Sequence, residues 1–233
     1  MVLPYDDVRN LPLPDLSLRL LKSLGTEPNF NNLIQGFKNR GYGEPQPPDL
    51  ATMLARLSDA WAWLESHALV GPSAQNPPGG WHRVTTAGAE VANDPNAVAK
   101  VWAADRLAGA LHPALSSARS NFALGDYETA SFAAMKAVEV EVRRVAVLPN
   151  DLLGVNLMRK AFSPKEGVLR DPGAEAGEQQ ATADLFAGAI GAYKNPASHR
   201  TVQFDDPMEA AEVVQLADLL LRIVQRADAR LHP

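Results

Sequence analysis

The sequence contains no cysteine. A disulfide, a zinc–thiolate site and a cysteine nucleophile are therefore excluded. Only five histidines are present, and they form neither an H-x₃-H pair nor an H-E-x-x-H motif. We therefore expect no metal site and no cofactor.

Long apolar runs and an excess of cations are also missing. No apolar stretch approaches the roughly 20 residues of a membrane span, and the first residues carry no cationic region like that of a signal peptide. We therefore expect a cytoplasmic protein. The net charge is −5, from 22 Lys and Arg against 27 Asp and Glu. Proteins that coat duplex DNA are usually basic, so this class is disfavoured, although a local cationic site is compatible with the balance.

What is present is the composition of a globular, mainly α protein. Of 233 residues, 46% are hydrophobic and 21% charged, and alanine outweighs the β-branched residues. Residues 1–14 are rich in proline and predict an extended arm. The best candidate for a boundary between domains is the Asp94-Pro95-Asn96 turn. We therefore expect two domains, residues 15–95 and 96–233.

The first domain shows a pattern of three helices, a hairpin and a further helix. The expected elements are helices over 16–24, 29–40 and 49–67, a hairpin from 69–71 and 81–85, and a helix over 87–93. This order, and above all the stretch from Trp63 to Gly88, resembles a winged helix-turn-helix. The polar face of the 49–67 helix offers one cation, Arg56, against Asp59 and Glu65.

Residues 1–98 carry seven Lys and Arg against ten Asp and Glu. Because phosphate contacts need cations, this balance disfavours DNA binding. A protein partner is the better expectation, with Trp63 and the proline-rich arm as its contact points.

The second domain is expected to be an antiparallel helical bundle. The predicted helices cover 97–124, 127–147, 155–162, 179–194 and 208–230, with a loop over 163–178. Two side-chain placements follow from spacing. Glu139 and Arg143, four residues apart, are expected to form an ion pair on a helix surface, and His112 is expected to begin a helix before Pro113.

The segment that carries chemistry runs from Tyr193 to Arg200. Pro196 interrupts a helix there, which is expected to bring a cation, an amide and an imidazole together. His199 can accept and return a proton near neutral pH, Lys194 can offset the charge of a phosphorane, and Asn195 can bind the same oxygen.

The run from Lys194 to His199 resembles the Arg-x₄-His motif of HEPN domains, and most closely their Ymh-type branch. Further sequence segments resemble those of the family and occur in the same order as in it: Leu111-His112-Pro113, Phe122 to Ala130, Ala134 to Arg143, and Gly154 to Phe162. Together they cover about residues 100–230, so the second domain is identified as a member of this superfamily.

The resemblance implies a metal-independent endoribonuclease of phage defence, abortive infection or a toxin–antitoxin pair. Two protomers would form a homodimer through the bundle and share one cleft for single-stranded RNA. The resemblance makes His199 the general base or acid and places Lys194 where the family has Arg. Asn195 would be the polar neighbour that orients this pair. Arg200 and Tyr193 would bind substrate, although packing into the bundle is the commoner role for such a tyrosine.

Lysine at position 194 leaves alternatives open. Arginine grips phosphate with a planar fork, whereas lysine is a point charge on a flexible stem. The domain could therefore be a weak or inactive HEPN that serves as an adaptor or subunit of a defence complex. A winged-helix transcriptional regulator is the third reading.

Overall fold

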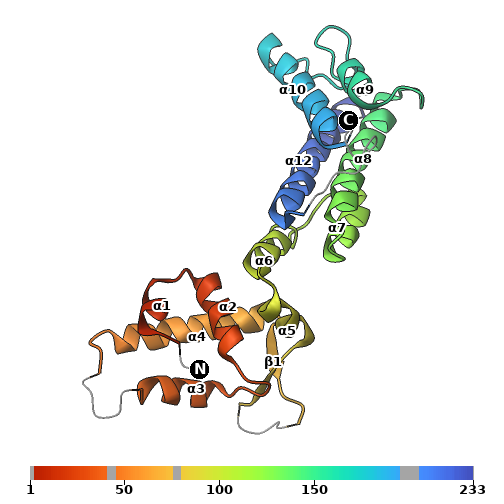
Figure 1. Ribbon diagram of the computed structural model, residues 1–233. Coiled ribbons are helices and arrows are strands. Elements are labelled where there is room, and N and C mark those ends of the chain that lie inside the picture. Colours follow the sequence, from red (N-terminus) through yellow and green to blue (C-terminus); the bar gives the residue numbers. More distant parts are fainter. Residues whose placement is uncertain (1–2, 41–45, 76–79, 195–204, 233) are drawn as a thin grey trace. The chain divides into compact units, whose positions relative to one another are not determined.

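The computed structural model describes residues 3–40, 46–75, 80–194 and 205–232 (Figure 1). The prediction of a mainly helical protein is confirmed, since the described part holds many helices and one small two-stranded sheet. The chain divides into two compact units, residues 1–98 and 99–233. None of the described helices is long and apolar enough to cross a membrane.

The first unit contains five helices and one hairpin in its described part. They are α1 (Tyr5–Asn10), α2 (Leu13–Ser23), α3 (Phe30–Lys38), α4 (Leu50–Ser66), β1 (Val70–Pro72), β2 (His82–Val84) and α5 (Thr86–Asn93). The strands are antiparallel, with Val70 opposite Val84. The apolar stripe of α4, including Met53 and Leu57, is buried with Leu16 and other residues of α2.

The predicted extended arm is wrong, because most of residues 1–14 are helical. Pro4 and Pro12 precede α1 and α2 as their N-caps, where a missing N–H costs nothing. Val8 is fully buried in the first core. The guanidinium of Arg9 donates to both carboxylate oxygens of Asp49, at 2.7 and 2.9 Å, and so ties α1 to the start of α4.

The polar face of α4 is also used within the unit. Arg56 donates from Nε to the carbonyl of Val8 at 2.6 Å, and from a terminal nitrogen to the carbonyl of Leu11. Trp63 is partly buried and stacks on His67, with ring centroids 3.8 Å apart. Trp63 and the N-terminal segment therefore both pack onto the fold, and their role as contact points for a protein partner stays a prediction.

The second unit is a helical bundle. It contains α6 (Ala97–Arg106, which begins just before the division between the units), η1 (Pro113–Leu115), α7 (Ser116–Ala123), α8 (Tyr127–Ala146), α9 (Gly154–Ala161), α10 (Ala176–Ala189), η2 (Ile190–Lys194) and α12 (Pro207–Leu231). The long helices α8 and α12 lie side by side at its centre (Figure 1). Both bury small and β-branched side chains in one core, such as Val138 and Val142 on α8 and Val214 on α12.

The ends of these central helices follow from local sequence. Asp126 begins α8 by accepting the N–H of Thr129 at 3.1 Å, after Gly125 has turned the chain at φ 77°. Asp206 likewise accepts the N–H of Met208 at 2.8 Å, and Pro207 occupies the first turn of α12. The predicted ends of both helices are therefore confirmed to within one residue.

The predicted single helix over 97–124 is wrong, because the chain is not helical over 107–112. Pro113 can occupy only the first turn of a helix, so the helix must begin again there. His112 starts η1 by accepting the N–H of Ala114, as expected, and its own N–H donates to the buried carboxylate of Asp218 at 2.6 Å.

The segment after α9 folds back on the end of that helix. The N–H of Leu169 donates to the carbonyl of Ala161 at 2.9 Å. Gly167 lies so close that a Cβ there would stand 2.3 Å from the backbone nitrogen of Ser163 and 2.6 Å from the Ala161 carbonyl oxygen. Only glycine fits this approach.

We expect Gly167→Ala to lower the free energy of unfolding by about 1–3 kcal/mol, because the added methyl group meets backbone that cannot move aside. Urea denaturation followed by circular dichroism measures the change. Gly188→Ala on α10 is the matched control, since a Cβ there meets nothing within 4 Å. That control should gain about 0.5–1 kcal/mol from helix propensity. Equal stability of the two variants would contradict the close approach.

Candidate functional site

The sequence segment singled out for chemistry begins where α10 ends. The predicted helix over 179–194 is α10 followed by a π-helical turn, η2. Such turns are rare and occur often at functional sites. A Cβ on Gly191 would stand 3.4 Å from a methyl group of Val155, so η2 passes close to α9. Lys194 is the last residue of the turn.

Lys194 points to a carboxylate inside the bundle. Its Nζ lies 2.9 Å from Oε2 of Glu139, in the middle of α8. Arg143 lies 2.8 Å from the other oxygen, and the backbone N–H of Gly154 donates to Oε2 at 3.0 Å. Arg143 also donates to the carbonyl of Leu152 at 3.1 Å. We call Glu139, Arg143, Lys194 and the Gly154 N–H the Glu139 cluster.

This cluster is shielded from water. The side chain of Glu139 is 6% exposed, that of Arg143 13% and that of Lys194 15%. Burial raises the pKa of Glu139, but the hydrogen bonds from Lys194 and Arg143 outweigh it, and the pKa lies below its ordinary value. The carboxylate is therefore ionised, and two cations around one anion leave a net charge of +1.

The arrangement can hold an ammonium group in a fixed place. A lysine side chain is flexible, but the buried carboxylate restrains the end of this one. An ammonium has three N–H donors, and Glu139 accepts one of them. The cluster can therefore present a positioned cation, which is what the developing charge of a phosphoryl transition state requires.

The predicted site residues divide between described and undescribed parts of the chain. Lys194 is placed as above. Tyr193 is partly buried and packs against the core of the second unit, which is the packing role weighed against substrate binding. Asn195, His199 and Arg200 lie outside the described residues.

The expected surface ion pair of Glu139 and Arg143 forms, but its predicted exposure is wrong. Glu139 lies on the buried face of α8, one turn from Met135 and Val142. An acid on that apolar stripe, spaced by three and four residues, is the sequence signal that could have revealed a buried partner. The spacing by itself could not name Lys194, which is 55 residues away.

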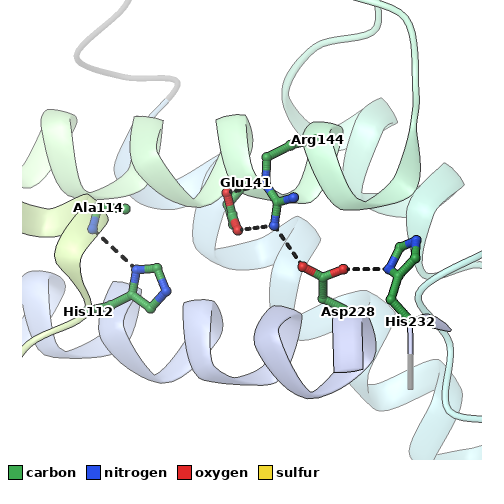
Figure 2. Close-up of polar contacts among 6 residues, drawn as sticks. All are labelled: His112, Ala114, Glu141, Arg144, Asp228 and His232. Atoms are coloured by element: carbon green, nitrogen blue, oxygen red, sulfur yellow. Dashed lines mark hydrogen bonds and ion pairs between the residues drawn. The ribbon is translucent and has the colours of Figure 1, made fainter. Parts of the chain in front are cut away.

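A second polar cluster joins α8 to α12 on the outside of the bundle (Figure 2). Arg144 lies 2.7 Å from Glu141 and 2.8 Å from Asp228, and His232 lies 2.9 Å from the second oxygen of Asp228. The hydrogen bond from Arg144, followed by that from His232, lowers the pKa of Asp228. This cluster fastens two helices at a solvent-exposed surface, since the side chains of Arg144 and His232 are 57% and 70% exposed. Across the described ranges, no three His, Asp or Glu side chains gather in a way that could hold a metal ion.

Residues 110–224 match the model of a family described as "Protein of unknown function (Hypoth_ymh)". The matched range runs from just before η1 into the last turns of α12 and includes the Glu139 cluster. The Ymh-type resemblance expected for this part of the chain is therefore confirmed. No curated protein and no solved structure matches the chain.

We expect Glu139→Gln to cost about 3–5 kcal/mol of stability at pH 7, because it leaves two buried cations without a counter-ion. The lowered pKa sets the pH dependence. The contribution of Glu139 is complete above its ordinary value of 4.5 and is lost as the pH falls through the lower folded value. The difference between wild type and variant should therefore shrink below about pH 4.5.

Urea denaturation at pH 7 and at pH 3.5–4.5 measures this difference. Glu209→Gln on α12 is the control, since Glu209 is exposed and makes no ion pair with another described residue. Its effect should stay within about 0.5 kcal/mol at every pH. A Glu139→Gln penalty that persists unchanged in acid would contradict an ionised Glu139.

Proposed function

We propose that the second unit is a HEPN-type domain and that the protein is a metal-independent endoribonuclease. The resemblance of the Lys194–His199 run to the HEPN motif motivates this, and the match of residues 110–224 to the Ymh-type family supports it. The observation that carries the proposal is the Glu139 cluster. It fixes the cation of the motif, Lys194, at the end of a helix, five residues before His199.

The proposed reaction is an internal transfer within single-stranded RNA. His199 takes the proton of a ribose 2′-hydroxyl, and the 2′-oxygen forms a bond to the adjacent phosphorus. The bond from phosphorus to the 5′-oxygen breaks, and that oxygen takes up a proton. The products are a 2′,3′-cyclic phosphate end and a free 5′-hydroxyl end. Lys194 offsets the charge that develops on the phosphorane, while Asn195 orients the reacting groups.

The cellular setting that fits such an activity is an effector of phage defence, abortive infection or a toxin–antitoxin pair. In this proposal two copies of the chain pair through their helical bundles, and their Lys194 and His199 residues face one shared cleft. Arg200, together with the exposed part of the partly buried Tyr193, would contact the RNA. The second unit carries 15 Lys and Arg against 17 Asp and Glu over 99–233, so a cleft for RNA requires a local concentration of cations.

A second candidate is a weak or inactive HEPN domain that acts as an adaptor in a defence complex. The observation that favours it is the direct contact of Lys194 with an ionised carboxylate. Glu139 offsets part of the ammonium charge, which weakens its hold on a phosphate. An arginine would keep further donors for the substrate after bonding Glu139.

For the first unit we propose a winged-helix-like fold that binds a protein. The order of α2, α3, α4, the hairpin and α5 supports this. The segment before α3 runs beside β2, where the N–H of His82 donates to the carbonyl of Pro28 at 2.8 Å. A transcriptional regulator is disfavoured, because Arg56, the cation on the polar face of α4, donates to backbone carbonyls of its own unit. On the same face, Glu65 forms an ion pair with His82 at 2.8 Å.

The test of the reaction is incubation of the purified protein with labelled single-stranded RNA in EDTA. We expect cleavage that persists without divalent cations, cyclic phosphate ends, and a loss of at least about 100-fold in His199→Ala. His232→Ala is the control, because His232 is an exposed histidine of the same unit. Cleavage that needs Mg²⁺, or that persists in His199→Ala, would contradict the metal-independent mechanism with His199 as its base.

Replacement of Lys194 separates the enzyme from the adaptor. We expect Lys194→Met to slow cleavage by about 10²–10³, as for loss of one transition-state donor, and Lys194→Arg to raise it by about tenfold. Lys136→Met, an exposed lysine on α8, should change nothing. If wild type and Lys194→Arg both fail to cleave RNA at any concentration, the adaptor is the better reading.

A further inference from the structure

A pocket of about 430 Å³ lies in the second unit, away from the Glu139 cluster. It is bounded by the first half of α10, the last turns of α12 and the segment that follows α9. Phe162, Leu169 and Ile223 are its apolar lining. Its volume lies within the roughly 300–1,000 Å³ of ligand sites, and its position depends on the close approach of Gly167 described above.

Three arginines line this pocket: Arg170 from the segment after α9, and Arg226 and Arg230 from α12. Arg170 donates to the carbonyl of Gly167 at 3.2 Å. Arg230 lies 3.4 Å from Asp171 in a long ion pair, and it donates to the carbonyl of Leu169 at 3.5 Å. Arg226 makes no hydrogen bond or ion pair with another residue among those the structure describes. Most of the guanidinium N–H donors are therefore open to a ligand.

The charge of the lining is unbalanced. Asp171 and Glu178 are its acids, so three cations against two anions leave +1. One carboxylate oxygen of Glu178 also accepts the N–H of Glu175, as part of the capping box of α10. Arg226 and Arg230 are four residues apart on one helix and repel each other. A bound anion would relieve this repulsion.

We propose that this arginine pocket (Arg170, Arg226, Arg230, Phe162, Leu169 and Ile223) binds a small organic phosphate. Guanidinium forks match phosphate oxygens in pairs, and a phosphate monoester carries close to two negative charges at neutral pH. The apolar lining takes the organic body of the ligand. A nucleoside monophosphate has both parts and is the simplest probe.

This pocket is a different place from the proposed RNA-cleaving site. Thr182 lines it, and Lys194 lies twelve residues further along α10 and η2. At about 1.5 Å per residue this separates them by about 18 Å. The inference therefore does not depend on the proposed endoribonuclease activity, and it gives the second unit a ligand site of its own.

The test is calorimetric titration of the full chain with adenosine 5′-monophosphate, inorganic phosphate and adenosine. We expect adenosine 5′-monophosphate to bind at least about tenfold more tightly than either of the others, because only it uses both the arginines and the apolar lining. Arg226→Ala should weaken it at least about tenfold without lowering the melting temperature, since Arg226 holds nothing else in place. Arg119→Ala, an exposed arginine on α7, should leave binding unchanged.

Variants of the other site keep the two proposals apart. The double variant Lys194→Met/His199→Ala should bind adenosine 5′-monophosphate as wild type does. Loss of binding in that double variant, or equal affinity in Arg226→Ala, would overturn the assignment to this pocket. Absence of binding by any probe at millimolar concentration would overturn it as well, and inorganic phosphate as tight as the nucleotide would exclude a role for the apolar lining.

Discussion

The buried carboxylate of Glu139 is the constraint on which the second unit depends. A charge inside a helical bundle is tolerated only when other groups pair with it and satisfy its oxygens. Here Arg143 lies one turn along α8 itself, and two groups come from other elements: the N–H of Gly154 at the start of α9 and Lys194 at the end of η2. One side chain therefore fixes how α8, α9 and η2 meet.

This constraint also shapes what Lys194 can do. In water a lysine is a mobile point charge, but the ion pair with Glu139 restrains the ammonium of Lys194. The same carboxylate that positions the ammonium offsets part of its charge. The balance between positioning and neutralisation is the physical difference between the proposed endoribonuclease and the adaptor, and it turns on whether lysine or arginine stands at position 194.

The arginines of the chain fall into two groups by what surrounds them. Arg9 and Arg56 hold the first helices onto α4, and Arg143 and Arg144 fasten α8 to its neighbours. Arg226, by contrast, lines a pocket without a partner among the described residues. Net charge cannot make this distinction, because it counts every guanidinium alike. The acidic balance of the protein is thus compatible with local cationic sites for phosphate groups.

The helical class, the central helices and their ends follow from local sequence patterns alone. The caps at Asp126 and Asp206 and the apolar stripe of α4 are local features, because each involves residues within one or two helical turns. The motif of Lys194 and His199 was likewise readable as a spacing. The prolines near the N-terminus are ambiguous in sequence. They are typical of an extended arm, but Pro4 and Pro12 here precede helices as their N-caps.

Which polar groups are buried, and which groups they contact, depends on how the helices pack together. The spacing of four residues predicts the pair of Glu139 and Arg143, but Lys194 contacts Glu139 from 55 residues away. At the helix break before Pro113, Asp218 of α12 accepts the backbone N–H of His112. The arginine pocket likewise gathers side chains from α12 and from the segment after α9. Local propensity does not encode such encounters, because they follow from how whole helices pack, and it is packing that turns a surface ion pair into a buried, charged site.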